Sequence, residues 1–187
     1  MPSLSLYKEQ GLISEEEFQQ LCRFADLILE WNPRINLTGF KSRERVEEML
    51  LGESILAGRA MPRRFGAVLD FGSGAGIPGL VWAITERSLQ VTSLEIRQKK
   101  VAFQKEVVRS LGVKVEILLG RFPEAVLGRR FDIITSRAIR FSPALWTAGR
   151  RLLKPGGSLV RFAASNTREE GWKSIPISAR TALLILS

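Results

Sequence analysis

One stretch decides the fold of this chain: Val68-Leu69-Asp70-Phe71-Gly72-Ser73-Gly74-Ala75-Gly76-Ile77-Pro78-Gly79. It opens with a short apolar run, which predicts a buried strand. Glycines then occur at alternate positions, where a residue without Cβ allows a tight turn and a close approach to a ligand. Pro78 predicts the first position of a helix, because the missing N–H needs no partner there. A strand, a glycine turn and a helix N-terminus together predict a cradle for a nucleotide-like cofactor.

Two carboxylates favour one cofactor over another. The spacing Gly74-x-Gly76-x-x-Gly79 also fits the dinucleotide pattern, and a tight turn without a ligand is a third reading. We expect Asp70 to point into the cradle, where it would repel a pyrophosphate but tolerate an amine and a sulfonium. This favours S-adenosylmethionine over NAD. Glu95 ends the next predicted strand, about 20 residues after the turn, where an acid can bind a ribose diol; the alternative is a solvated charge.

Strands and helices alternate from Ala67 onward, which predicts a doubly wound, largely parallel sheet. Further strands are expected at 91–94, 115–119, 131–135, 158–162 and 182–186, with helices over 101–111 and from Ser142 to Lys154-Pro155-Gly156-Gly157. Residues 164–180 receive no strand, and their start at Ser165–Arg168 has the composition of a loop.

The first part of the chain reads as helical. Ser14 and Glu17 form a capping box that begins a helix, Pro33 is expected to end it, and a second helix runs from near Ser42 to Pro62. We therefore predict one domain over 1–187, with a helical extension (1–64) packed on an S-adenosylmethionine-binding α/β core (65–187).

The composition points to a polyanionic partner. The chain has 187 residues, 45% of them hydrophobic, and a net charge of +9. Residues 1–30 hold two basic and six acidic residues, so the remainder carries +13, and RNA is the first candidate partner. The cations expected to contact phosphates are Arg59, Arg63, Arg64, Lys99, Lys100, Arg129, Arg130, Arg150, Arg151 and Lys154.

The composition also excludes several kinds of site. The chain has no histidine and only one cysteine, Cys22, which excludes a histidine base, a histidine-ligated metal and an intramolecular disulfide and argues against a zinc site. We expect no metal. The N-terminus does not resemble a signal peptide, and no apolar run approaches the ~18 residues that span a bilayer. We expect a cytoplasmic protein without membrane contact.

Two arginines follow strands at the predicted carboxyl edge. Arg121 comes after the third strand and Arg137 after the fourth, with Arg140 close behind. Arginine there can hold a cofactor carboxylate or a substrate phosphate, or bond guanine O6. The alternative for these arginines is a salt bridge to Asp70, Glu95 or Asp132.

Several short segments together resemble a known family. They are Asn36-Leu37-Thr38-Gly39, the run from Asp70 to Gly79, Thr135-Ser136-Arg137-Ala138 and Leu153-Lys154-Pro155-Gly156-Gly157. The first of these either ties its loop down or contacts a ligand. In this order and spacing, from about Glu16 to Phe162, they resemble the glucose-inhibited division protein B family, the bacterial ribosomal RNA small-subunit methyltransferases G.

The resemblance implies a class I methyltransferase fold with a mostly parallel, seven-stranded sheet. It implies transfer of a methyl group from S-adenosylmethionine to N7 of a guanosine in small-subunit ribosomal RNA, free or in an assembling subunit, and we expect a monomer. Asn36 and Arg121 would lie near the methyl group or the guanine, and Arg137 completes the expected catalytic set. The expected cofactor-binding residues are Asp70, Gly72, Gly74, Gly76, Ile77, Glu95, Phe122, Pro123 and Arg137.

The chain departs from the family pattern at two places. The family's His-x-x-Asp-Ser-Leu stands here as Leu50-Leu51-Gly52-Glu53-Ser54-Ile55, and its Arg-Ala-Glu as Arg121-Phe122-Pro123-Glu124, so Pro123 or Glu124 takes the adenine side. The alternatives are a catalytically silent RNA-binding homologue, a methyltransferase for a small molecule and a nucleotide-dependent oxidoreductase. Guanine N7 carries a lone pair and no proton, so methylation there suits a chain without histidine.

Overall fold

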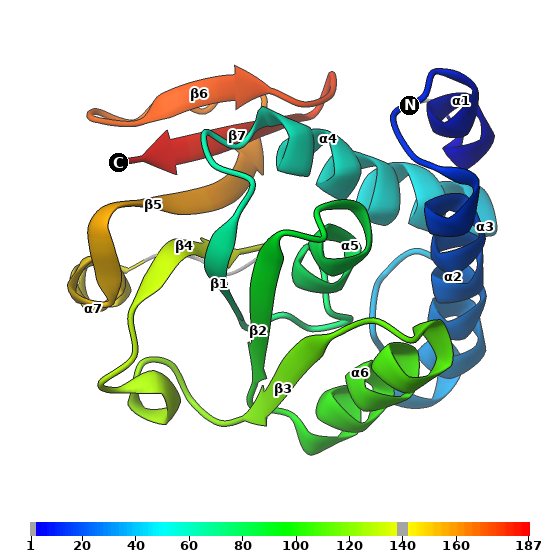
Figure 1. Ribbon diagram of the computed structural model, residues 1–187, viewed down its shortest axis with the longest axis horizontal. Coiled ribbons are helices and arrows are strands. Elements are labelled where there is room, and N and C mark those ends of the chain that lie inside the picture. The colour runs from blue at the N-terminus through cyan, green and yellow to red at the C-terminus, as the bar shows by residue number, and fades with distance from the viewer. Residues whose placement is uncertain (1–2, 138–141) are drawn as a thin grey trace.

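The strands of the computed structural model, which describes residues 3–137 and 142–187, form a single seven-stranded sheet in the order β3-β2-β1-β4-β5-β7-β6 (Figure 1). Strands β1 to β5 are parallel, whereas β7 runs antiparallel to both β5 and β6. This confirms the predicted doubly wound, mostly parallel architecture. The bounds are β1 Gly66–Phe71, β2 Leu89–Glu95, β3 Val115–Leu119, β4 Phe131–Ser136, β5 Leu153–Ala164, β6 Lys173–Pro176 and β7 Thr181–Leu186.

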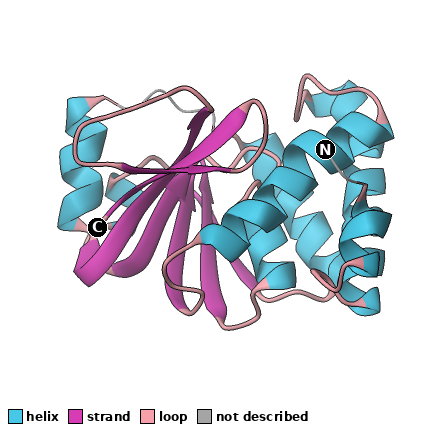
Figure 2. Ribbon diagram, turned by 90° about the horizontal axis from the view of Figure 1, so that it is seen from above, coloured by secondary structure: helices cyan, strands magenta, loops and turns pink. Residues whose placement is uncertain are grey.

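Helices stand on both sides of the sheet, with most of them on one side (Figure 2). The N-terminal part holds α1 Leu4–Glu9, α2 Glu15–Ile35, α3 Arg43–Val46, a π-helical turn at Glu47–Gly52 and α4 Glu53–Ala60. The α/β part holds α5 Gly79–Thr85, α6 Gln98–Leu111, a 3₁₀ turn at Glu124–Val126 and α7 Pro143–Arg151. Within the described ranges, no helix has the length and apolar character needed to cross a membrane.

Successive side chains of the central strands are buried on opposite faces of the sheet, as the two-residue period of a strand requires. Val68 and Ile133 pack with Trp82 of α5 on one face. Their neighbours Leu69 and Ile134 pack on the other face, in a cluster that also holds Val126, Leu152 and Leu159. The sheet is thus buried on both sides, which explains why its strands read as continuous apolar runs.

The helical extension shares one apolar core with helix α6 and the glycine turn. Phe24 of α2 packs against Phe103 of α6, with ring centroids 6.4 Å apart. The same apolar cluster includes Leu51 of the extension and Ala75 and Ile77 of the glycine turn. The core therefore crosses the boundary expected at residue 64 and fixes the extension against the turn.

The start of α2 agrees with its prediction, but its end does not. The Ser14 hydroxyl accepts the N–H of Glu17 at 3.2 Å, and the Glu17 carboxylate accepts the N–H of Ser14 at 2.7 Å, which confirms the capping box. Pro33 was expected to end the helix, yet α2 continues to Ile35. Proline fits helical φ, although it removes one i→i−4 hydrogen bond and crowds the carbonyl four residues earlier. The helix continues two residues past Pro33, and Asn36, in the left-handed conformation, ends it.

Three further predictions were wrong. The helix expected to close at Lys154–Gly157 ends at Arg151, and those residues form an irregular stretch of β5 where the register with β4 shifts between Phe131 and Ile133. Residues 173–176 form β6, which pairs with β7 at the edge of the sheet. The short segment has no strong apolar alternation of its own, so its sequence does not predict a strand. Pro78 lies just before α5 rather than at its first position.

Candidate active site

The glycine turn between β1 and α5 forms the centre of the candidate site. Gly72, Gly74 and Gly76 have φ values of 65°, 60° and 80°, in the left-handed region that favours glycine. A Cβ at Gly76 would lie 2.8 Å from the methyl carbons of Leu80, so this glycine is also needed for packing. A Cβ at Gly74 would meet only Lys100 Nζ, at 3.8 Å. The turn is therefore closely packed at Gly76 and leaves open space at Gly74.

The Glu95 carboxylate holds the turn from the neighbouring strand. Its Oε2 accepts the N–H of Gly74 at 2.8 Å, and its Oε1 accepts the N–H groups of Ile96 and Arg97 at 2.8 and 2.9 Å. Glu95 is only 6% exposed, so the alternative of a solvated charge is wrong. A carboxylate has about four acceptor sites, and these three donors leave one on Oε2 for a ligand hydroxyl.

Asp70 lies beneath the turn, fully buried. Its Oδ2 accepts the N–H of Gly79, the first residue of α5, at 2.9 Å, and its Oδ1 has no hydrogen-bond partner among the described residues. Burial raises the pKa of Asp70 to about 7, a shift that the bond from Gly79 opposes and the charge of Glu95 reinforces. Asp70 therefore already occupies a helix N-terminal N–H group that a pyrophosphate would use.

A buried polar cluster that sequence reasoning missed supports the same turn. Gln104 of α6 donates from Nε2 to the Ser73 hydroxyl and to the Gly74 carbonyl, both at 2.9 Å. Its Oε1 accepts the Ser93 hydroxyl at 2.6 Å, and the hydroxyls of Ser73 and Ser93 lie 2.7 Å apart. Gln104 is fully buried. The available signal was a polar residue on the apolar stripe of a helix, three residues after Val101 and three before Val107.

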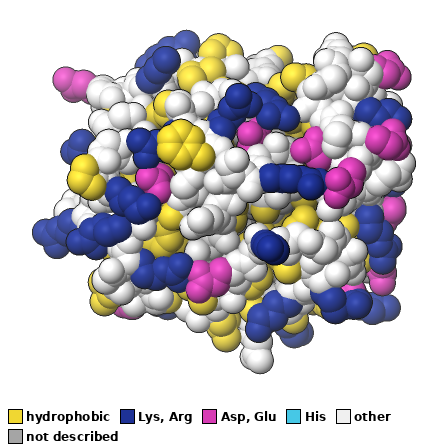
Figure 3. All heavy atoms as spheres, viewed as in Figure 1, with side chains coloured by type: hydrophobic (Ala, Val, Ile, Leu, Met, Phe, Trp, Pro, Cys, Tyr) yellow, Lys and Arg dark blue, Asp and Glu magenta, His cyan; other side chains and the backbone are white. Residues whose placement is uncertain are grey.

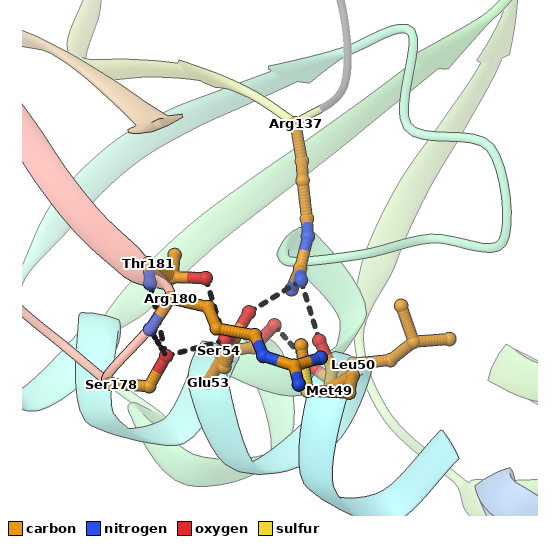
Figure 4. A network of polar contacts seen from close by, with 8 residues as sticks. All are labelled: Met49, Leu50, Glu53, Ser54, Arg137, Ser178, Arg180 and Thr181. Atoms are coloured by element: carbon orange, nitrogen blue, oxygen red, sulfur yellow. Dashed lines mark hydrogen bonds and ion pairs between the residues drawn. The ribbon is translucent and has the colours of Figure 1, made fainter. Parts of the chain in front are cut away.

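Arg137 follows β4 and forms a buried ion pair with Glu53 of α4 (Figure 4). Its Nη2 donates to Glu53 Oε2 at 2.6 Å and to the Met49 carbonyl. The guanidinium carbon lies 4.8 Å from the centroid of the Phe162 ring, a cation–π contact. Arg137 therefore does form a salt bridge, which was the alternative to a ligand contact. Its partner is Glu53, however, and not Asp70, Glu95 or Asp132. Ala138 and Arg140 lie outside the described residues.

Glu53 ties three segments of the chain together. It is fully buried, and its Oε1 accepts the hydroxyls of Ser178 at 2.9 Å and Thr181 at 2.6 Å (Figure 4). Burial lowers the pKa of the Arg137 guanidinium, and the contact with Glu53 opposes that shift. Arg137 Nη1 is buried without a hydrogen-bond partner among the described residues. Glu53 occupies the position of the aspartate in the family's His-x-x-Asp-Ser-Leu segment. The sequence showed that this position differs from the family pattern but did not predict its contact with Arg137.

Phe122 and Arg121 lie at the same edge of the sheet as the glycine turn. The Phe122 ring stacks on that of Phe71, the residue before Gly72, with centroids 4.2 Å apart and an interplanar angle of 17°. This contact brings the Phe122-Pro123 pair to the start of the turn. Arg121 precedes them and is exposed. Its only hydrogen bond within the described residues comes from its carbonyl, which accepts the N–H of Ala125.

Asn36 lies at the C-terminal end of α2 and is exposed, with φ of 51°. The loop after it is tied down by Asn32, whose amide donates to the carbonyls of Thr38 and Phe40 and accepts the N–H of Thr38. Asn36 is not needed for that role. It lines a cavity of about 540 Å³ together with Leu29, Asn32, Pro33, Thr38, Gly39 and Lys41.

The structure thus gathers part of the expected set. The turn glycines, Ile77, Asp70, Glu95, Phe122 and Pro123 surround one cradle, and Arg137 is committed through Nη2 to Glu53. Asn36 lines the cavity at the C-terminal end of α2. A larger hollow of about 860 Å³ lies at the opposite, amino edge of the sheet, beside Ala67, Leu89 and Val115. The catalytic and cofactor roles of all these residues stay predictions.

Removing the charge of Glu53 should destabilise the fold, because Arg137 would then be buried without a counter-ion. We expect Glu53→Gln to lower the free energy of unfolding by about 3 kcal/mol, since a buried cation loses its counter-ion, measured by urea denaturation. Adding Arg137→Met should recover part of this loss. A double variant that loses as much as the sum of the two single variants would show that the pair is not coupled.

The raised pKa of Asp70 predicts a pH-dependent stability. The unfolded carboxyl ionises near its ordinary pKa of about 3.9, whereas the folded one stays protonated until about pH 7. Stability is therefore lost as the pH rises from 4 to 7. Relative to wild type, Asp70→Asn should gain up to about 4 kcal/mol across this range, because asparagine can still accept the N–H of Gly79. Urea unfolding at several pH values measures the difference, and a pH-independent difference would refute the assignment.

Comparisons with known proteins identify the family. Residues 17–175 match the family model described as GidB, rRNA small subunit methyltransferase G. The ribosomal RNA small subunit methyltransferase G of Wolinella succinogenes is 33% identical over 174 residues, which cover 90% of this chain and 89% of the relative. The protein of the same name from Clostridium perfringens strain 13 is 32% identical, over 84% of this chain and 68% of the relative.

Solved structures agree on the fold. A 16S rRNA methyltransferase from T. thermophilus, solved with AdoMet and guanosine, superposes with a TM-score of 0.59 at 20% identity, over 72% of this chain and 42% of that one. The ribosomal protein L11 methylase of Lactobacillus delbrueckii subsp. bulgaricus gives a TM-score of 0.53 at 14% identity, over 79% and 80%. The fold is that of class I methyltransferases, and the chain belongs to the rRNA small subunit methyltransferase G family.

Proposed function

We propose that this protein is an S-adenosylmethionine-dependent methyltransferase that methylates N7 of a guanosine in small-subunit ribosomal RNA. Family membership over residues 17–175 supports the reaction class and the kind of RNA. The single structural observation that carries the proposal is the carboxylate-held glycine turn, in which Glu95 binds the Gly74 N–H and Asp70 binds the Gly79 N–H.

The residues around the turn fit this cofactor. The space above Gly74 is open, and Glu95 Oε2 retains an acceptor site suited to a ribose hydroxyl. Glu95 places negative charge where a cationic amine and sulfonium are favoured, and Asp70 occupies the Gly79 N–H group that a pyrophosphate would bind. We assign Asp70, Gly72, Gly74, Gly76, Ile77 and Glu95 to this site, with Phe122 and Pro123 beside the adenine. S-adenosylmethionine supplies an electrophilic methyl group when bound.

The protein residues have a limited chemical task in this reaction. Guanine N7 has an in-plane lone pair and carries no proton at neutral pH, so no general base is required. What the enzyme must supply is alignment of the base and exclusion of water. We propose that Arg121 and Asn36 contact the guanine, an arginine being suited to guanine O6. Arg137 belongs to the same edge of the sheet, and Glu53 fixes its orientation.

The charge around this edge suits an RNA substrate. Arg97, Lys99 and Arg121 follow strands β2 and β3 and are exposed. None of the three has a carboxylate within ion-pair distance in the part of the chain that the structure describes. We propose that they contact the phosphates of ribosomal RNA, free or in an assembling small subunit, and that the protein acts as a cytoplasmic monomer.

A labelled-methyl assay tests the proposal. Incubating the protein with unmodified small subunits and methyl-labelled S-adenosylmethionine should place label in the RNA as N7-methylguanine. Arg121→Gln and Asn36→Ala should each lower kcat/KM about 10-fold or more, equivalent to about 1.4 kcal/mol or more, while cofactor affinity measured by calorimetry stays unchanged. Arg23→Gln, an exposed arginine of α2, is the matched control and should be neutral.

Each alternative has its own outcome in this assay. Cofactor binding without label in any RNA would favour a silent RNA-binding homologue. Label in free guanine nucleotides, with weak salt dependence, would favour a small-molecule substrate. A thermal shift with NAD and none with S-adenosylmethionine would overturn the cofactor assignment.

A further inference from the structure

The amino edge of the sheet, opposite the glycine turn, carries most of the cations that the sequence assigned to phosphate contact. Arg63 and Arg64 precede β1, Arg129 and Arg130 precede β4, and Arg150, Arg151 and Lys154 lie at the turn into β5. Since β1 to β5 are parallel, residues before them lie at one edge and residues after them at the other. These cations therefore lie at the edge away from the glycine turn. Figure 3 shows a broadly basic face, with Lys and Arg side chains gathered at its left over α7.

Asp132 brings several of these groups to one place. Its Oδ1 lies 2.7 Å from Arg63 Nη1, and its Oδ2 lies 2.8 Å from Lys154 Nζ and accepts the N–H of Ala67 at 2.8 Å. Burial acts to raise the pKa of Asp132, but Lys154, the Ala67 N–H and Arg63 outweigh it, so that the pKa is lowered. One buried carboxylate thus faces two cations, which leaves the local charge positive.

An exposed aromatic ring lies beside Arg63 in this cluster. Phe65 is 61% exposed, and the Arg63 guanidinium carbon lies 5.1 Å from its ring centroid. The next residue, Gly66, packs so closely on Asp132 that a Cβ there would lie 2.5 Å from Oδ2. This packing fixes the backbone beside Phe65 while the ring itself projects into solvent. A largely exposed aromatic side chain among cations is the composition of a surface that stacks on nucleic-acid bases.

Two unpaired arginines extend the cluster along the edge. The N–H of Phe131 donates to the Leu152 carbonyl at 2.9 Å, so the residues before them, Arg130 and Arg151, lie on neighbouring segments. Both are exposed, and neither has a carboxylate partner among the described residues. Among the described residues, the one ion pair of Arg64 is a long contact of 3.8 Å to Glu86, which also binds Arg59 at 2.9 Å.

We propose that these side chains form a second RNA-binding surface, which we call the amino-edge platform: Arg63, Arg64, Phe65, Arg130, Arg151 and Lys154. A base of a single-stranded RNA segment stacks on Phe65, and the cations bind the phosphates on either side. The platform extends the RNA substrate of the proposed function and holds a part of the RNA distant from the methylated guanosine. An anionic membrane is less suited to it, because one exposed ring inserts little apolar surface.

The platform can be tested without catalysis. A fluorescein-labelled oligouridine of 12 residues contains no guanine, so its binding, followed by fluorescence anisotropy, is independent of methyl transfer. Phe65→Ala should weaken binding about 10-fold, consistent with one lost base–aromatic stack. Phe65→Tyr should retain binding. Arg130→Gln with Arg151→Gln should reduce the slope of log affinity against log salt by about 1.4, the value for two phosphate contacts on a single strand.

A matched control carries the same change of charge on another surface. Arg23→Gln with Lys105→Gln removes two exposed cations from α2 and α6, and it should leave both affinity and salt slope near wild type. Equal losses in the control and platform variants would overturn the proposal, because binding would then depend on net charge alone. Binding to phosphatidylserine vesicles that depends on Phe65, with oligouridine binding that does not, would also overturn it in favour of a membrane.

The result is separable from that of the methylation assay. Oligouridine binding that depends on Phe65 in a protein without methyl transfer supports the platform and rejects the proposed reaction. Methyl transfer to small subunits together with Phe65→Ala binding like wild type rejects the platform and leaves the reaction intact. Circular dichroism of each variant shows that the exposed substitutions preserve the fold.

Discussion

The contacts of the Glu95 carboxylate with three backbone N–H groups are the constraint on which the site depends. They join the end of β2 to the glycine turn and to the start of α6, and Asp70 performs the same task at the start of α5. The free N–H groups at such a turn usually attract an anion. Here the protein supplies the anions itself. A ligand that approaches the turn therefore meets the Glu95 carboxylate, which favours hydroxyls and positive charge and disfavours phosphate.

The same principle, a buried acid that satisfies donors from distant segments, governs the end of β4. Arg137 is oriented by Glu53, 84 positions earlier in the chain, and Glu53 is in turn bonded by Ser178 and Thr181 beyond β6. A buried ion pair gives little net stability, but it specifies one arrangement when every other acceptor is also occupied. The helical extension is consequently part of the site rather than an appendage. Any shift of α4 would move the guanidinium at the carboxyl edge.

The features that the sequence predicted well are those set by local signals. The strand at Val68, the turn glycines and the Ser14 cap each depend on neighbouring residues. The errors have other causes. Helix α2 continues through Pro33 to Ile35, and the short β6 is defined by its hairpin pairing with β7 rather than by an apolar pattern of its own. The partner of Arg137 and the role of Gln104 required knowing which segments meet in space, which no spacing in this chain reveals.

The two edges of the sheet also explain how the positive charge is distributed. Because β1 to β5 run in one direction, a cation's place before or after its strand decides its edge, and this rule separates Lys99 from Arg130 without further information. The six residues of β1 span about 20 Å, and the Debye length in physiological salt is about 8 Å. Charges at the amino edge therefore contribute little to the potential at the glycine turn. Cations at the amino edge that act on RNA must therefore act on a different segment of it from the one at the glycine turn. A partner large enough to reach both edges accounts for a protein that is basic at both.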